Sequence, residues 1–238
     1  MLSQIPQHVG VILDGNRRYA RELMKKPWHG HKIGVQKARD VLKWADEMGI
    51  KYVTAYVLSA ENYKTRPHVE LKMILRYFDE ELDEVLSNNH TVHDTQTRVK
   101  FIGRLGILPE GLQKKMHKVE NLTSRYEKHV IYVCVAYGGQ QEIVDACKAI
   151  AQRVSGGLIK PAEIDERIFA HYLYLNGEAP YPDLVLRTGG ERRISNFLLW
   201  QTAYSELFFI DKKWPELDRR TFARVIQEYG KRQRRFGK

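Results

Sequence analysis

The alternation of short apolar runs with helical patterns most constrains the fold of this chain. Six runs rich in β-branched and aromatic residues are almost continuously apolar, at residues 9–13, 52–58, 99–105, 130–136, 184–186 and 207–210. Between them, apolar residues recur at helical spacing over about 33–48, 69–86, 109–126, 141–154, 165–175 and 219–230. Continuous apolar strands are typical of sheets covered on both faces, and their alternation with helices favours parallel pairing. We predict an α/β fold with a mostly parallel six-stranded sheet and helices on both faces.

The length of the chain fits a single domain. A chain of 238 residues can bury a sizeable core, and no linker, repeat or low-complexity stretch divides it. The longest loop-like stretches, 59–67 and 176–182, are too short to separate folding units. We expect one domain over residues 1–238, without a secretory signal or an apolar run long enough to span a bilayer. The expected location is the cytoplasm.

The excess of basic residues indicates an anionic partner. The formal net charge is +10 at pH 7, which attracts nucleic acid, anionic membrane surfaces and small phosphorylated substrates alike. Basic residues gather after the first strand and at the C-terminus. Such a run is a solvated surface about as often as it is a binding site. Charge alone leaves the partner open, so a basic nucleic-acid-binding protein is an alternative function.

The first strand runs into small residues and arginines, in the block Val11-Ile-Leu-Asp-Gly-Asn-Arg-Arg-Tyr19. Ligands of α/β proteins bind at the carboxyl ends of parallel strands, where glycine admits a ligand close to the backbone and arginine grips phosphate oxygens. Asp14 is the one carboxylate of this block, and a carboxylate beside a phosphate needs a divalent ion between them. The block predicts a phosphate site that uses Mg²⁺.

A second block of this kind follows the strand at 184–186. It reads Arg187-Thr-Gly-Gly-Glu-Arg-Arg-Ile-Ser-Asn-Phe197, with three arginines and two glycines at a strand end. We expect Ser195 or Asn196 to cap a helix that carries residues 197–200. The composition favours a second phosphate contact at the same edge of the sheet.

Polar side chains also follow the second strand, over residues 59–67. Ser59, Glu61 and Asn62 offer hydrogen bonds, Tyr63 an aromatic wall and Arg66 a further cation. Read without context, this stretch is an ordinary polar turn before a helix. The next helical segment, 69–86, carries apolar residues on two sides, which fits either packing on the sheet or the wall of a hydrophobic tunnel.

Other kinds of site have weak support. The histidine pairs lack a third ligand at zinc spacing, and no phosphate-binding Gly-x-x-x-x-Gly-Lys-Ser/Thr element or Ser/His/Asp arrangement occurs. Cys134 and Cys147 show no disulfide or metal pattern, and we expect both to be buried.

With these blocks in view, the sequence resembles the cis-prenyltransferases, the family of undecaprenyl and dehydrodolichyl diphosphate synthases. The matches run in order along nearly the whole chain, through residues 8–20, Gly30-His31 with Gly34, 59–63, Tyr137-Gly-Gly139, 183–200, 203–207 and Trp214-Pro215. The resemblance implies a parallel six-stranded sheet with a hydrophobic tunnel. It also implies an enzyme that condenses isopentenyl diphosphate onto an allylic prenyl diphosphate, with loss of a proton and formation of a cis double bond.

The resemblance assigns roles to individual residues. Asp14 and Glu206 would hold Mg²⁺, and Asp14 and Asn62 would be the catalytic residues, Asn62 being linked to proton removal. The allylic diphosphate would be cradled by Gly15, Asn16, Arg17 and Arg18 and faced by His31, and the isopentenyl diphosphate would be bound by Arg187, Arg193 and Ser195. The remaining substrate-binding positions are Tyr19, Ser59, Ala60, Glu61, Tyr63, Arg66, Ile194, Arg235 and Gly237.

The resemblance further implies a homodimer, because Arg235-Phe-Gly237 matches a terminal element that reaches the partner's isopentenyl diphosphate site. Contact with a membrane surface would suit a long product, and no nucleic acid is expected. Pro27 and Arg192 depart from the family pattern, where arginine and histidine are common. The starter, the product length and an irregular or short-chain condensation stay open.

Overall fold

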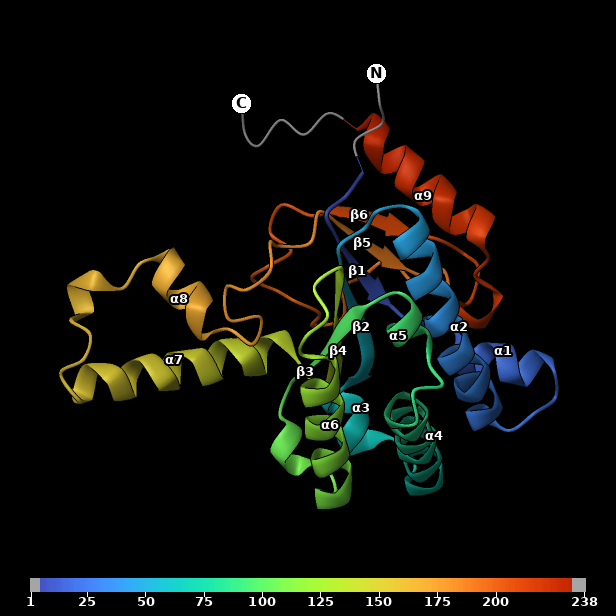
Figure 1. Cartoon of the computed structure of the whole chain (residues 1–238), viewed down its shortest axis with the longest axis horizontal. Coiled ribbons are helices and arrows are strands. Elements are labelled where there is room, and N and C mark those ends of the chain that lie inside the picture. Colours follow the sequence, from blue (N-terminus) through green and yellow to red (C-terminus); the bar gives the residue numbers. More distant parts are fainter. Residues whose placement is uncertain (1–4, 233–238) are drawn as a thin grey trace.

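The computed structural model describes residues 5–232, and its centre is one sheet of six parallel strands (Figure 1). The strand order is β3-β4-β2-β1-β5-β6. The strands are β1 (His8–Ile12), β2 (Tyr52–Ser59), β3 (Thr97–Ile102), β4 (His129–Tyr137), β5 (Leu184–Arg187) and β6 (Glu206–Phe209). The central strands β1 and β5 are buried along their whole length, which explains why they read as unbroken apolar runs. The predicted α/β class and strand number are confirmed.

Helices follow most strands within the described residues. They are α1 (Asn16–Glu22), α2 (Pro27–Glu47), α3 (Ala60–Thr65), α4 (His68–Leu86), α5 (Thr91–Asp94), α6 (Glu110–Thr123), α7 (Gly139–Ser155), α8 (Glu166–Tyr172) and α9 (Arg219–Lys231). Short 3₁₀ turns cover Leu105–Ile107, Pro161–Glu163 and Trp214–Glu216. None of the helices in residues 5–232 is both long and apolar enough to cross a membrane.

The two faces of the sheet are covered differently. On one face, buried residues of α2, α4, α6 and α9 pack with the strands into the larger apolar cluster. On the other face, irregular segments contribute Leu175, Ala179, Phe197 and Leu198 to a smaller cluster. Helices α7 and α8 lie on this second side and extend away from the sheet (Figure 1). The arrangement leaves the carboxyl ends of β1, β2 and β5 open to ligands.

Three local predictions were wrong or incomplete. The expected helix over 197–200 is a series of turns, because Ser195, Asn196 and Leu198 adopt positive φ, which no α-helix tolerates. The short helices α1, α3 and α5 were not predicted, since each is too short to show a period. Cys134 is buried as expected, but Cys147 is exposed on α7.

Candidate active site

A cleft of about 1160 Å³ lies at the carboxyl ends of β1, β2 and β5. It is formed by the turn after β1 with α1, by the segment after β2 with α3, and by the turn after β5. Most of the residues singled out from the sequence line it: Asp14, Gly15, Asn16, Arg17, Arg18, His31, Ser59, Glu61, Asn62, Arg66, Arg187, Arg193 and Ser195. Segments far apart in sequence, such as those of Asp14 and Arg187 at 173 positions, thus meet at one edge of the sheet, as parallel pairing requires.

Asp14 lies at the centre of the cleft and is held from several sides. Its carboxylate accepts hydrogen bonds from the Gly15 backbone N–H (2.6 Å) and from Arg187 Nη2 (2.8 Å), and Arg18 Nη2 lies 3.2 Å away. The Thr188 hydroxyl donates to the Asp14 carbonyl oxygen at 2.8 Å. These contacts fix the carboxylate between two arginines, so it faces the place where a phosphate would bind.

Gly189 permits the close approach of the two turns. Its φ is +84°, and a Cβ on it would lie 2.6 Å from Arg18 Nη2 and 3.2 Å from the Asp14 backbone. Any side chain here would be strained by the positive φ and would crowd Arg18 and the Asp14 backbone.

The turn after β5 is organised by Arg187, whose side chain is almost fully buried. Its Nη1 donates to the Arg193 carbonyl oxygen (2.5 Å) and to Ser195 Oγ (2.7 Å). Its Nε has no partner among the described residues. The guanidinium therefore joins Asp14 to the 193–195 turn and keeps one donor for a further acceptor.

The segment after β2 presents Asn62 to the cleft on α3. Ser59 caps this helix by accepting a hydrogen bond from the Asn62 N–H at 3.0 Å. Asn196 Nδ2 donates to Glu61 Oε1 at 2.8 Å, which ties α3 to the turn after β5. Tyr63 does not line the cleft, because its hydroxyl donates to the Ile107 carbonyl oxygen.

A buried network joins α2 and α4 at the side of the cleft. Arg66 Nη1 donates to Glu70 Oε1 (2.7 Å) and to His31 Nε2 (2.9 Å), and Arg17 lies 3.5 Å from the same carboxylate. Burial lowers the pKa of His31, and the Arg66 charge acts in the same direction. A neutral imidazole fits the geometry, because Nε2 then accepts from Arg66. Although burial opposes ionisation, the hydrogen bonds and these cations hold the pKa of Glu70 below its usual value.

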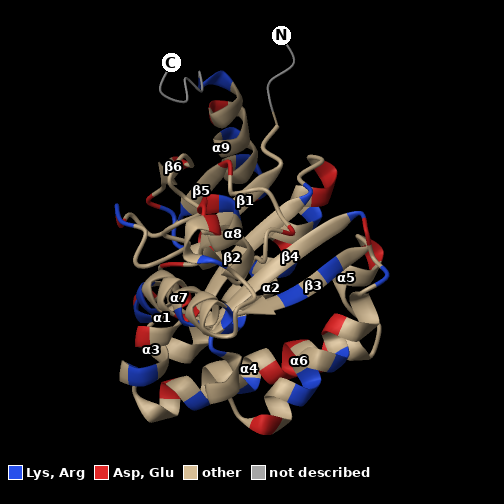
Figure 2. Cartoon of the chain, turned by 90° about the vertical axis from the view of Figure 1, so that its left-hand side faces the viewer, with Lys and Arg blue, Asp and Glu red and all other residues tan. Residues whose placement is uncertain are grey.

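The lining of the cleft is strongly basic. Seven lysine and arginine side chains line it, against the two carboxylates of Asp14 and Glu61; the cations are Arg17, Arg18, Arg21, Lys25, Arg66, Arg187 and Arg193. Elsewhere the charges are mixed, and both signs alternate along α4 and α6 (Figure 2). The local excess of cations, rather than the net charge of the chain, indicates a ligand with several negative charges.

The polar cleft adjoins an apolar cavity of about 140 Å³ between α2, α4 and the sheet. Leu13, Asn16, His31 and Val57 line both spaces. The Asn16 Oδ1 is buried and has no hydrogen-bond partner among residues 5–232. The site thus joins a place for anions directly to a place for hydrocarbon, which is the shape that a prenyl diphosphate needs. The cavity lies beside the helix that the sequence offered as a tunnel wall.

Some of the predicted site residues lie elsewhere. Tyr19, Ala60, Tyr63 and Ile194 do not line the cleft, and Ala60 is buried beneath it. Arg235 and Gly237 lie outside the described residues. Ten of the lining residues were not among the predicted set, and four of these carry a charged or amide side chain: Arg21, Lys25, Gln140 and Asn196. The basic run after the first strand and the second block contained three of them, but only the fold selects which members face the cleft.

Glu206 is not brought to the cleft within one chain. It begins β6, where it is paired in register with Leu184 at the start of β5, so it lies at the amino edge of the sheet. Its carboxylate accepts a hydrogen bond from Arg232 Nη1 at 2.5 Å. The sequence did not predict this position of Glu206. The apolar run at 207–210 predicts a strand, but it does not show at which edge of the sheet the residue before that strand lies.

The residues of the cleft fit a magnesium ion that binds together with substrate. Residues 5–232 contain no cluster of three or more acidic, histidine or cysteine side chains that would hold a metal by themselves. Mg²⁺ in phosphate-transferring sites is commonly held by one or two carboxylates plus substrate phosphates and water. Asp14, half-enclosed and surrounded by phosphate-binding groups, supplies such a carboxylate.

Comparison with known proteins identifies the family to which a chain with this site belongs. The family model described as "Putative undecaprenyl diphosphate synthase" matches residues 12–237. The chain belongs to the cis-prenyltransferase family. A tritrans,polycis-undecaprenyl-diphosphate synthase (geranylgeranyl-diphosphate specific) of Methanopyrus kandleri is 47% identical over 237 residues, which are 99% of this chain and 86% of that protein. The protein of the same name from Methanocaldococcus jannaschii is 44% identical over 98% of this chain and 83% of its own length.

Solved structures agree with this assignment. Lavandulyl diphosphate synthase from Lavandula x intermedia, solved in complex with dimethylallyl diphosphate, gives a TM-score of 0.91 at 32% identity, covering 98% of this chain and 99% of that one. A probable undecaprenyl diphosphate synthase from Campylobacter jejuni gives 0.80 at 30% identity, with 99% and 100% covered. This cis-prenyltransferase is therefore a prenyl-transferring enzyme, and the predicted family and activity class are confirmed.

Proposed function

We propose that this cis-prenyltransferase elongates geranylgeranyl diphosphate with isopentenyl diphosphate to make a polyprenyl diphosphate. The observation that carries the proposal is the shared wall of Leu13, Asn16, His31 and Val57, which joins a basic cleft to an apolar cavity. One amphipathic substrate can then place its diphosphate among the arginines and its hydrocarbon between α2 and α4.

The two diphosphates would occupy the two turns that Asp14 and Arg187 join. Arg17, Arg18 and the backbone after Asp14 hold the allylic diphosphate, and Arg193 and Ser195 beside Arg187 hold that of isopentenyl diphosphate. Arg187 orients the second turn through its bonds to Ser195 and Asp14. Both substrates are thereby held with their reacting carbons between the turns, which supplies much of the rate enhancement.

The reaction begins with cleavage of the allylic carbon–oxygen bond, whose electron pair leaves with diphosphate. Negative charge grows on the leaving group, where Arg17, Arg18 and backbone donors stabilise it. Mg²⁺ held by Asp14 would supply further charge neutralisation there. The double bond of isopentenyl diphosphate then forms the new carbon–carbon bond, and a proton is lost to leave the cis double bond.

Asn62 is the proposed positioning group for this proton loss. It lies exposed in the cleft on α3, fixed by the Ser59 cap. A neutral amide is a poor base. We therefore assign it to orienting the diphosphate oxygen or water that takes the proton.

The choice of starter rests on the relatives. Relatives at 43 to 47% identity carry geranylgeranyl-diphosphate specificity in their names. The structural similarity to lavandulyl diphosphate synthase keeps an irregular condensation as the second candidate. The experiment is to supply labelled isopentenyl diphosphate and Mg²⁺ with dimethylallyl, geranyl, farnesyl or geranylgeranyl diphosphate, and to resolve products by mass.

We expect a series of products that grow by five carbons, formed fastest from geranylgeranyl diphosphate and absent when a chelator is added. A ten-carbon product that forms from dimethylallyl diphosphate alone, and carries no label when labelled isopentenyl diphosphate is present, would favour the irregular condensation instead. The absence of product from any starter would contradict the proposed function.

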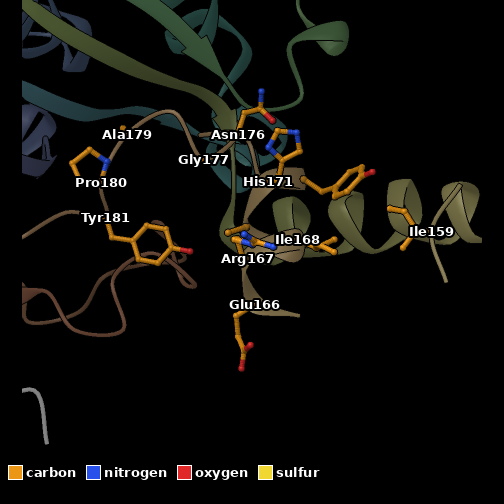
Figure 3. A pocket seen from close by; sticks show the side chains of 12 residues that line it. Ile159, Glu166, Arg167, Ile168, His171, Asn176, Gly177, Ala179, Pro180 and Tyr181 are labelled. Carbon is orange, nitrogen blue, oxygen red and sulfur yellow. The ribbon is translucent and has the colours of Figure 1, made fainter. Parts of the chain in front are cut away.

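We further propose a homodimer that forms through the α7–α8 side of the molecule. Helices α7 and α8 project from the sheet (Figure 1), and Val144 on α7 and Ile164, two residues before α8, are exposed. A pocket beside α8 is lined by Ile168, His171 and Tyr181 among others (Figure 3). An exposed apolar surface of this kind suits a second copy of the chain.

The test is sedimentation of the purified protein. Val144→Glu is expected to shift the dimer to monomer, whereas Val69→Glu, at an exposed position on α4, is not. Truncation after Arg232 is expected to raise the KM for isopentenyl diphosphate without unfolding the dimer. A monomeric wild type, or equal effects of the two valine variants, would contradict the dimer proposed here.

A peripheral membrane contact is proposed at the tip after α1. Leu23 and Met24 are exposed there, Met24 almost completely, and Arg21, Lys25 and Lys26 flank them. Apolar side chains ringed by cations suit an anionic membrane surface. Co-sedimentation with vesicles containing phosphatidylglycerol should fall for Met24→Ser, and equal binding of wild type and variant would contradict the contact.

A further inference from the structure

Three polar side chains line the far part of the otherwise apolar cavity. They are Arg39 from α2, Glu81 from α4 and His90 from the turn before α5. Apart from the residues shared with the cleft, the rest of the cavity wall is aliphatic or aromatic. Charged side chains beside hydrocarbon are costly unless they are paired, so their placement needs a reason.

The three side chains form one bonded unit, which we call the deep clamp. Arg39 Nε and Nη2 donate to Glu81 Oε1 (2.9 Å) and Oε2 (2.5 Å). His90 Nδ1 accepts from the Val92 N–H at 3.1 Å, so Nε2 carries the ring hydrogen and donates to Glu81 Oε1 at 2.6 Å. Although burial opposes ionisation, these donors hold the pKa of Glu81 below its usual value. The clamp is therefore a charged, bidentate bond between α2 and α4.

The deep clamp ties the two helices together away from the reaction centre. At the mouth of the cavity, His31 Nε2 of α2 lies 3.3 Å from Glu70 Oε1 of α4, and Arg66 Nη1 donates to both atoms. Arg39 follows His31 by eight positions, or about 12 Å along α2, and Glu81 follows Glu70 by eleven, or about 16 Å along α4. Between these levels the walls of the cavity are apolar.

The clamp also holds the far end of the cavity. His90 is the N-cap of α5, and α5 contacts α2 and β3. Val92 of α5 lines the cavity together with Val99 and Ile131, which are paired in register on β3 and β4. Through His90, the clamp fixes α5 against α4, so it controls both the width and the floor of this space.

The present volume of the cavity is small for a polyprenyl chain. About 140 Å³ is close to the roughly 150 Å³ cavity that accommodates benzene in another protein. A growing chain must therefore push α4 and α5 away from α2. The clamp opposes this separation more strongly as the chain reaches it.

We propose that the Arg39–Glu81–His90 clamp determines product length by resisting the separation of α2, α4 and α5 as the prenyl chain grows. The inference rests on the proposed function and names specificity-determining residues for it. When the strain of further opening exceeds the gain from burying another prenyl unit, the product leaves instead of being extended.

The test compares product lengths under saturating isopentenyl diphosphate. His90→Asn keeps an acceptor for the Val92 N–H but loses the bond to Glu81. Glu81→Gln keeps the shape but loses the charge. Glu80→Gln is the matched control, because it makes the same change one residue away, in the exposed Arg76–Glu80 pair of α4.

Both clamp variants are expected to shift the main product upward by at least one five-carbon unit, while Glu80→Gln matches the wild type. Should a single variant unfold, Arg39→Met with Glu81→Met removes the charges together, a change that buried ion pairs often tolerate. Unchanged or shorter products from folded clamp variants, alongside wild-type product, would overturn this inference alone. A wild type that makes no product would overturn the proposed function as well.

Discussion

At the residue scale, the account depends on the contact between Asp14 and Arg187. The two residues are 173 positions apart and lie 2.8 Å from each other. The sequence placed each at the end of a strand, and the parallel sheet explains why they meet. It did not predict that Asp14 is already held by arginines, since that depends on the path of the turn through Gly189.

Replacing Asp14 by alanine is expected to abolish turnover while the fold persists. The side chain is partly exposed and not part of the apolar core, so its loss leaves the packing intact. Of the two carboxylates that line the cleft, Asp14 is the one that lies between Arg18 and Arg187, so it is the proposed ligand of Mg²⁺ beside the leaving diphosphate. Initial rates and the thermal melting curve of the variant test this together. Turnover close to that of the wild type would contradict the role assigned to Asp14.

At the element scale, long helices and strands were predictable and short ones were not. The strands and the five long helices show their period directly, and the structure has them close to the expected bounds except that α2 begins at Pro27 rather than near residue 33. α8 (Glu166–Tyr172) is as short as α1, but it lies within the predicted segment 165–175. The start of α1 is determined by Gly15 in a left-handed conformation, and the start of α3 by the Ser59 cap. Neither helix shows a repeating apolar pattern. These two helices carry Arg17, Arg18 and Asn62, so the least predictable elements hold the site.

Gly30 tests how α2 positions the turn after β1. A Cβ on Gly30 would lie 1.9 Å from the Asn16 carbonyl oxygen, whereas Gly111 on α6 has no atom within 4 Å of the corresponding position. Gly30→Ala should lower the free energy of unfolding by more than about 1 kcal/mol and also reduce activity, and Gly111→Ala should be neutral or stabilising. Chemical denaturation of both variants is the measurement. Equal effects would show that α2 does not pack on α1 as described.

At the scale of the whole molecule, the sheet joins the two ends of the described chain. β1 pairs with β2 on one side and with β5 on the other, so segments near both ends share one core. We infer from this that residues 1–238 act as one domain. The alternation of strands and helices predicted the sheet, but strand order and the edge that Glu206 occupies follow only from the path of the chain.

The buried His8 gives the molecule an acid-sensitive core. Nδ1 donates to the Pro180 carbonyl oxygen (2.6 Å), so Nε2 accepts from the Thr54 hydroxyl (2.8 Å) and the ring is neutral. Burial lowers the pKa of His8 from 6.5 to about 4. The unfolded chain therefore binds the proton more readily, and stability is lost as the pH falls from 6.5 towards 4, by up to about 3 kcal/mol.

Urea denaturation across this pH range checks the effect. His8→Asn can still donate to Pro180 but does not titrate, so it should show a shallower decline than the wild type. Parallel declines would mean that other groups dominate the acid sensitivity.

The central claim is that one amphipathic substrate spans the basic cleft and the apolar cavity. The most direct measurement is a crystal structure with a thio analogue of geranylgeranyl diphosphate and Mg²⁺. The account predicts the diphosphate beside Asp14, Arg17 and Arg18, with the prenyl chain between α2 and α4 and pointing toward Arg39 and Glu81. A prenyl chain lying on the α7–α8 side, or a diphosphate bound away from Asp14, would contradict it.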